Sequence, residues 1–262
     1  MLYSTDSKLK VDIRRGKIME CLRLCGKVYV SELSRDLAVT PATIRSDLSE
    51  LEKGGYLVRV NGGAIARSGG SQRALEFGEN RSVPRAAEKE AIAETVAGMI
   101  QNGDTLFINS GTTTKMIASA LKEHLNLNIV TNSLAVATAL ENAVGFRVTV
   151  LGGELNTKYG FTYGSDALEK LARYHADWAI LSVDGVSAET GITTYHAEEA
   201  LIDCQMINEA KQVLIAADDS KIGRAGFMKV CDCSDNMQII TNRSAKPELA
   251  QLRKNGISVI EC

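Results

Sequence analysis

The sequence predicts an α/β protein built from a small N-terminal domain and a larger domain with a doubly wound, mostly parallel sheet. Within the first 67 residues, three helical patterns are followed by a strand–turn–strand pattern. A glycine- and serine-rich break follows at residues 67–72. Beyond it, short apolar, β-branched runs alternate with helical patterns. We therefore expect domains at 1–67 and 85–262, joined by a linker at 68–84.

Composition narrows the class of protein. The chain has 262 residues, of which 45% are hydrophobic and 24% charged, as is typical of globular domains. No apolar run approaches the roughly 18 residues that span a membrane, and the N-terminus lacks the apolar segment of a secretory signal. The six cysteines form no C-x-x-C pair. We expect a cytoplasmic protein with reduced cysteines, no metal and no other cofactor.

Charge is distributed unevenly along the chain. Residues 1–67 contain 12 Lys and Arg against 8 Asp and Glu, a net charge of +4, and the remaining residues carry −6. A basic segment on an acidic body favours contact with a polyanion, although +4 is also compatible with an ordinary solvated surface.

The N-terminal patterns are arranged as helix, helix, helix and hairpin. We expect helices over about 9–25, ending at Gly26, and from a Ser31 cap to about Ala38. A third begins with Thr40 as cap and Pro41 as its first residue, and ends at 54–55. Strands at 56–60 and 64–67 flank the turn at 61–63. This order is that of a winged helix-turn-helix domain, whose second paired helix enters the DNA major groove.

The third helix has an unusually small polar face. Ile44, Leu48 and Leu51 lie on one side at helical spacing, while the other side carries short side chains and Arg45. The major groove is about 12 Å wide and admits a helix whose exposed face is not bulky. Arg45 can pair with a guanine or with a phosphate, and the sequence does not choose between them.

Hydroxyls at the start of this helix suit phosphate oxygens, and the glycines of the wing allow its backbone to approach DNA closely. The predicted DNA-binding residues are Thr40, Pro41, Ala42, Thr43, Arg45, Ser46, Ser49, Arg59, Asn61, Gly62 and Gly63. The alternative is a three-helix subdomain with an ordinary polar surface.

These residues also carry a family resemblance. The stretch VYVSELSRDLAVTPATIRSDLSELEKGGYLVRVNGGA resembles the N-terminal domain of the DeoR family of bacterial transcription regulators. Ser46 stands where that family often has a second basic residue, and Asn61 where it often has histidine. Both departures concern the operator sequence that is recognised.

In the larger domain, polar loops follow the predicted strands. We expect strands at 105–109, 128–131, 147–151, 178–183, 212–218, 237–241 and 257–261. Helices are expected at about 85–100, 112–123, 133–142, 165–174 and 197–210, with a short helix between the last two strands. Because ligands of open parallel sheets bind outside the carboxyl ends of the strands, these loops are expected to converge on one crevice. The predicted effector-binding residues are Ser110, Gly111, Thr112, Thr113, Thr114, Asn132, Ser133, Gly152, Gly153, Asp184, Gly185 and Lys221.

The chemistry of these residues favours an anion that also carries hydroxyls. Helix N-termini, hydroxyls and glycine amides bind phosphate, Lys221 adds a positive charge, and Asp184 and Asn132 suit sugar hydroxyls. Each feature also has a plain structural reading. The GTTT run can be a helix cap and lacks P-loop spacing, Gly152-Gly153 can be a tight turn, and Glu198 and Glu199 are favourable partners of a helix dipole.

GTTT, VTNS, LGG-x-L, SVDGV and ADDSKIG again resemble the DeoR family, here its effector domain. The resemblance implies a fold similar to ribose-5-phosphate isomerase and coenzyme A transferases, and effectors that are phosphorylated sugars or related metabolites. Asn109 stands where the family commonly has an acidic residue.

Together these features predict a homo-oligomeric repressor, a dimer or tetramer, that binds double-stranded operator DNA of a carbohydrate-metabolism operon and responds to a phosphorylated sugar. It is expected to contact no membrane and to be no enzyme. One alternative is a sugar-phosphate isomerase-like or acyl-transfer enzyme with an appended DNA-binding domain, using Asp184, Glu198 and Lys221. Another is a regulator whose larger domain only oligomerises.

Overall fold

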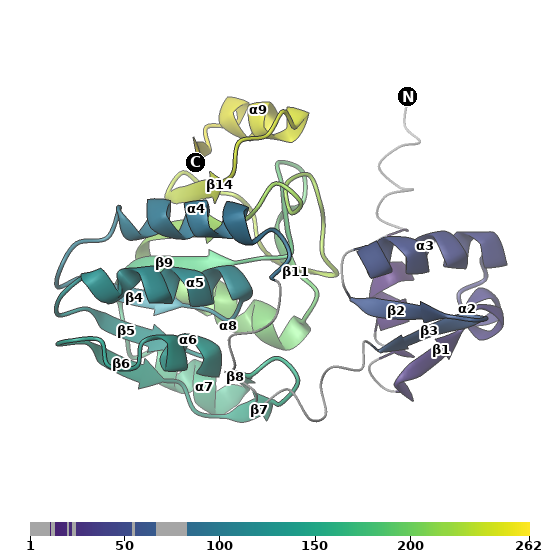
Figure 1. Ribbon diagram of the computed structural model, residues 1–262, viewed down its shortest axis with the longest axis horizontal. Helices are drawn as coiled ribbons and strands as arrows, with labels where there is room; N and C mark the ends of the chain where they lie inside the picture. Colours follow the sequence, from purple (N-terminus) through teal and green to yellow (C-terminus); the bar gives the residue numbers. More distant parts are fainter. Residues whose placement is uncertain (1–10, 12–13, 20, 23–24, 54–55, 67–82) are drawn as a thin grey trace. The chain divides into compact units, whose positions relative to one another are not determined.

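The chain forms two compact units in the computed structural model, residues Met1–Glu76 and Phe77–Cys262 (Figure 1). The structure describes residues 11, 14–19, 21–22, 25–53, 56–66 and 83–262. The predicted helix end at 54–55 and most of the predicted linker at 68–84 lie outside these residues. Each unit is described by itself.

The N-terminal unit combines helices with a three-stranded antiparallel sheet. The described residues among 11–25 are helical. The other elements are β1 (Lys27–Tyr29), α2 (Val30–Asp36), α3 (Pro41–Lys53), β2 (Leu57–Val60) and β3 (Gly63–Ala66), with strand order β1-β3-β2. Strand β1 was not predicted, because three residues are too few to show an alternating pattern.

The start of α2 differs from the prediction. The helix begins at Val30 with Tyr29 as its N-cap, and Ser31 lies inside its first turn. Tyr29 pairs with Gly63 in the sheet, and the Val30 N–H donates to the Gly62 carbonyl at 2.8 Å. Strand pairing therefore sets this boundary. The Thr40 cap of α3 is confirmed by a 3.2 Å hydrogen bond from the Thr43 N–H to Thr40 Oγ1.

The second unit is a three-layer α/β domain around a seven-stranded sheet. Its strand order is β15-β14-β12-β9-β4-β5-β6, and all six pairings are parallel. The strands are β4 (Thr105–Ile108), β5 (Asn128–Thr131), β6 (Arg147–Val150), β9 (Ala176–Ser182), β12 (Ala210–Ala216), β14 (Met237–Thr241) and β15 (Ser258–Glu261). All seven predicted strands are confirmed within a few residues.

Helices cover both faces of this sheet (Figure 1). They are α4 (Ala86–Ala97), α5 (Thr112–Ala120) with a 3₁₀ turn (Leu121–Glu123), α6 (Leu134–Ala139), α7 (Ser165–Leu171), α8 (Ala197–Asn208) and α9 (Pro247–Lys254). Buried residues of α4, α5 and α6 share one core with Leu106, Ile108 and Leu214. Those of α7, α8 and α9 share the other with Phe107 and Val213. Successive strand residues thus face opposite layers, as a doubly wound sheet requires.

Five short strands in this unit were not predicted. They are β7 (Glu154–Asn156), β8 (Phe161–Tyr163), β10 (Gly185–Ser187), β11 (Gly191–Thr194) and β13 (Met228–Cys231). β7 pairs with β8, and β10, β11 and β13 form a small antiparallel sheet. Both pairings lie in segments that follow strands of the main sheet. Within the described residues, no helix is long and apolar enough to cross a bilayer.

Candidate DNA interface and effector site

Helix α3 presents the small polar face that its sequence predicted. Ile44, Leu48 and Leu51 are at most 2% exposed and form the core of the N-terminal unit. On the other side, Ala42, Arg45 and Ser46 are exposed, and Ser49 is partly exposed. Pro41 is the first helical residue. The face available to a partner is therefore narrow and carries one guanidinium, which suits insertion into a groove.

A buried carboxylate fixes α3 against the first helical segment of the N-terminal unit, which contains Arg14 and Arg15. Asp47 is only 2% exposed. It accepts hydrogen bonds from Arg14 Nε at 2.5 Å and Arg15 Nε at 3.0 Å. Asp47 was not among the residues predicted to have a role. The available signal was its place among Ile44, Leu48 and Leu51, because a carboxylate within an apolar stripe needs a buried partner.

The hydroxyls at the start of α3 already have partners. Thr40 Oγ1 lies 2.9 Å from Thr43 Oγ1 in addition to accepting the Thr43 N–H. Both residues stabilise the helix start, and their contact with phosphate stays a prediction.

The wing divides into an exposed tip and a buried base. Arg59, Asn61 and Gly62 are exposed, and Gly62 adopts a φ of 80°, which favours glycine. Gly63 is instead buried in β3, where a Cβ atom would lie 2.0 Å from the Val28 carbonyl oxygen. The predicted DNA contact of Gly63 therefore does not match its burial, and close strand packing is what requires this glycine.

In the second unit, Asn109 ties the end of β4 to two neighbours. Its side chain is fully buried. Nδ2 donates to the Ser182 carbonyl at 3.0 Å and to Asp203 Oδ1 at 2.9 Å, while Oδ1 accepts the Ser182 N–H at 2.9 Å. An amide can donate and accept at once, whereas an ionised carboxylate would only accept and would repel Asp203. This accounts for an amide at position 109.

The loop after β4 leads into α5 with one threonine open to solvent. Thr112 is exposed, whereas Thr113 and Thr114 are 4% and 0% exposed, and Thr114 Oγ1 donates to the Gly111 carbonyl at 3.1 Å. A Cβ atom at Gly111 would lie 2.7 Å from Ser182 Cβ, so the loop packs closely against β9. Thr113 and Thr114 thus have packing roles, which differs from the ligand contact predicted for them.

The residues after β5 are held by the β8 segment. Asn132 and Ser133 are at most 1% exposed. Ser133 Oγ accepts the Val136 N–H at 3.2 Å and so caps α6. Asn132 Nδ2 donates to the Thr162 carbonyl at 3.1 Å, and within the described part of the chain its Oδ1 has no hydrogen-bond partner. Asn132 is thus the better candidate of the two for a ligand.

Two of the predicted glycines are required by the backbone. Gly153 has a φ of 113°, and a Cβ atom there would lie 2.3 Å from the Tyr163 carbonyl oxygen, which fits the tight-turn reading. Gly152 is exposed with nothing near its Cβ position. Gly185 is buried in strand β10 and not in an open loop, and a Cβ atom there would lie 2.4 Å from the Arg224 carbonyl oxygen.

The ends of β9 and β12 are joined by an ion pair. Lys221 Nζ lies 3.0 Å from Asp184 Oδ1. Asp184 Oδ2 accepts the Tyr195 N–H at 3.1 Å and the Thr194 hydroxyl at 3.3 Å. Burial acts to raise the pKa of Asp184, but Lys221, the Tyr195 N–H and the charge of His196 outweigh it and hold the pKa below its ordinary value. Lys221 is therefore a paired cation at the carboxyl ends of these strands.

Two carboxyl groups on α8 complete the arrangement. Glu199 is 8% exposed and Asp203 is fully buried. Burial, together with the charges of Asp203 and Asp184, raises the pKa of Glu199 well above its ordinary value. Burial also raises the pKa of Asp203 to about 7. A carboxyl group that keeps its proton can donate to a hydroxyl as well as accept from one. Glu199 was predicted only as a partner of the helix dipole, because the sequence does not show which glutamate at the start of a helix is buried.

A chain of polar contacts links three strand ends. Glu199 bonds to the Ser110 hydroxyl and, at 3.3 Å, to the Thr194 hydroxyl, which also bonds to Asp184. Asp184 in turn pairs with Lys221. Three predicted residues, Ser110, Asp184 and Lys221, are thus brought together, whereas the loops after β5 and β6 bond to the β8 segment instead. Among the residues that the structure describes, no cluster of His, Cys, Asp and Glu is arranged to hold a metal ion.

Comparison with known proteins assigns both domains to one family. Residues 14–69 match the DeoR-like helix-turn-helix domain, and residues 85–243 match the DeoR C terminal sensor domain. The glycerol-3-phosphate regulon repressor of Escherichia coli (strain K12) is 35% identical over 222 residues, which are 85% of this chain and 87% of that protein. The transcriptional repressor GlcR of Bacillus subtilis (strain 168) is 31% identical over 244 residues, 93% of each chain.

Solved structures of other proteins are less similar. Ribose 5-phosphate isomerase A from Methanocaldococcus jannaschii has a TM-score of 0.39 at 14% identity, covering 51% of this chain and 53% of its own. The delta subunit of eIF2B from Chaetomium thermophilum has a TM-score of 0.40 at 16% identity, covering 53% and 50%. The two domain matches and the near full-length relatives show that this chain belongs to the DeoR family of DNA-binding transcription regulators.

Proposed function

We propose that this protein represses a carbohydrate-metabolism operon and that a phosphorylated sugar, bound at the carboxyl ends of the parallel strands, relieves the repression. The observation that carries the proposal is the linked set Ser110, Glu199, Thr194, Asp184 and Lys221. It places a lysine and protonatable carboxyl groups at the carboxyl ends of neighbouring strands. The lysine can bind the anionic end of a ligand, and the carboxyl groups can bind the hydroxyls at its other end.

Specific groups suit each end of such a ligand. The exposed Thr112 hydroxyl and the N–H groups at the start of α5 favour a phosphate beside Lys221. The Asn132 Oδ1 atom, which has no partner within the described residues, and the Glu199 carboxyl suit sugar hydroxyls. The relative that is named a glycerol-3-phosphate regulon repressor supports the same class of ligand.

Regulation requires that the effector favour one state of the protein over another. Two copies would place their α3 helices in operator half-sites about 34 Å apart, and effector binding would change the pose of these helices. Typical coupling between sites is about 1–3 kcal/mol, which corresponds to a change of about 5- to 150-fold in operator affinity. Homo-oligomerisation is part of the proposal for this reason.

The test replaces the cation of the site. An operator is first obtained by in vitro selection from random duplexes, and its affinity is measured with and without glycerol 3-phosphate, ribose 5-phosphate and glucose 6-phosphate. We expect Lys221→Ala to bind operator within about twofold of wild type and to lose the response to the sugar phosphate, because its cation is gone. Lys221→Arg should keep part of the response. A full response in Lys221→Ala would remove this site from the proposal.

A matched control uses another lysine that pairs with an aspartate. Lys211 lies 2.8 Å from Asp177 in an exposed ion pair at the opposite end of the strands. Lys211→Ala should respond like wild type. We also propose that the protein does not turn over its ligand, and formation of a ketose from ribose 5-phosphate would contradict this part.

A further inference from the structure

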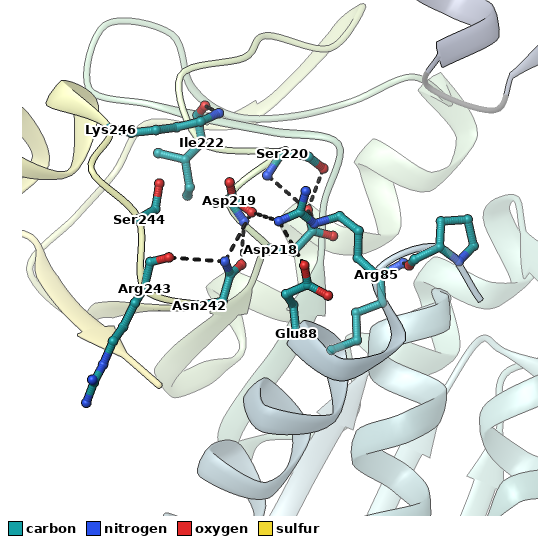
Figure 2. Close-up of polar contacts among 12 residues, drawn as sticks. Arg85, Glu88, Asp218, Asp219, Ser220, Ile222, Asn242, Arg243, Ser244 and Lys246 are labelled. Carbon is teal, nitrogen blue, oxygen red and sulfur yellow. Dashed lines mark hydrogen bonds and ion pairs between the residues drawn. The ribbon is translucent and has the colours of Figure 1, made fainter. Parts of the chain in front are cut away.

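Arg85 joins the beginning of the sensor domain to the end of strand β12. It is the N-cap residue of α4, and its guanidinium forms ion pairs with Asp219, with Asp218 at 3.5 Å and with Glu88 at 3.2 Å (Figure 2). Asp218 and Asp219 lie two and three residues after the end of β12, and Lys221 follows them after Ser220. The first helix after the connection from the DNA-binding domain is therefore tied to the predicted effector site.

At Arg85, the residue that forms these ion pairs, the backbone adopts an unfavourable conformation. Its φ and ψ are 60° and 45°, in the left-handed region that residues other than glycine seldom occupy. Among the described residues, no side chain caps α4 by a hydrogen bond at this end. The ion pairs of Arg85 therefore oppose a backbone preference, and their release would relieve it.

The two carboxylates keep other donors when Arg85 leaves. Asp218 accepts the Ser220 N–H at 3.0 Å, as well as the Ser220 hydroxyl. Asp219 accepts from Asn242 Nδ2 at 3.1 Å, and its own N–H donates to Asn242 Oδ1 at 2.8 Å (Figure 2). Release of Arg85 thus leaves neither carboxylate without a hydrogen bond, which lowers the cost of release.

Other cations lie beside this contact. Lys89, one turn further along α4, is half-buried, and its Nζ donates to the Pro84 carbonyl at 3.0 Å. Burial lowers the pKa of Lys89; Asp218 opposes the shift, and the nearby charges of Lys221 and Arg85 add to it. An anion placed among Lys89, Lys221 and Arg85 would be favoured by all three, and a planar guanidinium matches phosphate as well as carboxylate.

We propose that Arg85 is an effector-binding residue that acts as a latch between two partners. In the structure its guanidinium holds Asp218 and Asp219. When the anionic group of the effector binds beside Lys221, the guanidinium transfers to it, the strained backbone relaxes, and the first turn of α4 moves. This proposal rests on the proposed function, since it assigns the regulation of the same site.

Two variants separate binding from release. Asp219→Asn weakens the latch but keeps Arg85 available, so it should bind the sugar phosphate at least about threefold more tightly than wild type. Arg85→Gln also opens the latch but removes the guanidinium, so it should bind at least about tenfold more weakly. Asp232→Asn is the matched control, because Asp232 pairs with Lys229 in a remote and exposed ion pair. It should bind like wild type.

Binding is measured calorimetrically on the full chain with glycerol 3-phosphate, ribose 5-phosphate and glucose 6-phosphate, and with glycerol as the uncharged counterpart. Hydrogen exchange of the peptide covering residues 83–92 is followed in parallel. We expect faster exchange in Asp219→Asn without ligand, and in wild type only when the sugar phosphate is added. Unchanged melting temperatures show that the variants are folded.

The outcomes distinguish the two proposals. If wild type binds a sugar phosphate and Arg85→Gln binds it equally well, the latch is refuted while the proposed function stands. If no sugar phosphate binds wild type, the proposed function fails and the transfer of Arg85 fails with it. Unchanged exchange of residues 83–92 in Asp219→Asn would refute the latch whatever the ligand result.

Discussion

Replacing Asp47 with alanine should loosen α3 without altering the face that it presents to DNA. Asp47 is on the buried side of the helix, whereas Arg45 and Ser46 are exposed. The substitution removes the acceptor of both Arg14 Nε and Arg15 Nε. It therefore tests whether buried electrostatics hold the recognition helix in place.

The expected magnitude follows from the two lost hydrogen bonds. A hydrogen bond to a charged group contributes about 1.5–3 kcal/mol, and an unpaired buried charge adds to the loss. Here the two arginine side chains remain 15% and 20% exposed, so water can replace their partner in part. We therefore take about 2–3 kcal/mol in total, which corresponds to an increase of about 30- to 150-fold in the equilibrium constant for opening of the helix.

Hydrogen exchange of the α3 amides in the full chain measures this opening. Asp36→Ala is the control, because the Arg35–Asp36 pair has side chains that are 76% and 60% exposed. Such surface pairs contribute about 0–1 kcal/mol, so its exchange should rise less than about fivefold. An Asp47→Ala protein whose α3 amides exchange no faster than those of Asp36→Ala would refute the reasoning.

Three further predictions concern other parts of the molecule. Arg45→Ala should weaken operator binding by about 5- to 150-fold through loss of a base or phosphate contact, and unchanged anisotropy titrations across a salt series would exclude α3 as the reading helix. The pKa of Asp203 is raised from 3.8 to about 7, so between these pH values the folded protein keeps a proton that the unfolded chain has lost. The stability of the protein should therefore fall as the pH rises from about 4 to 7. Asp203→Asn should flatten the decline in melting temperature across that range, and a parallel decline would show that another group is responsible. Gly63→Ala should destabilise the wing because its Cβ would lie 2.0 Å from a β1 carbonyl oxygen. Gly62→Ala should cost only about 1–2 kcal/mol because of its positive φ. Equal urea midpoints for the two variants would contradict the packing role of Gly63.

The main elements of the fold were predictable because their patterns extend over several residues. Seven apolar strands and the helices between them follow from periodicity, and the Thr40–Pro41 helix start follows from capping chemistry. The short strands were not predictable. β1 and β10 have three residues each, which is too few to show an alternating pattern, and β1 pairs with β3, which is distant in the sequence.

The location of the candidate site at the strand ends could be predicted, whereas the burial of its carboxyl groups and its ion pairs could not. Strand ends carrying Ser110, Asp184 and Lys221 were identified from their position after apolar runs. Glu199 is buried because α8 packs against β11, where Thr194 bonds to it. The contact of Arg85 with Asp219 spans 134 positions. Neither signal exists in a local stretch of sequence.

The division of labour between the two domains is tested most directly by a hydrogen-exchange footprint of the full chain. The account predicts that operator DNA slows exchange in α3 and the wing tip, residues 41–53 and 59–62. A sugar phosphate should slow exchange in residues 109–114 and 197–203. Protection of the strand-end peptides by DNA alone, or no protection there by any phosphorylated sugar, would contradict it.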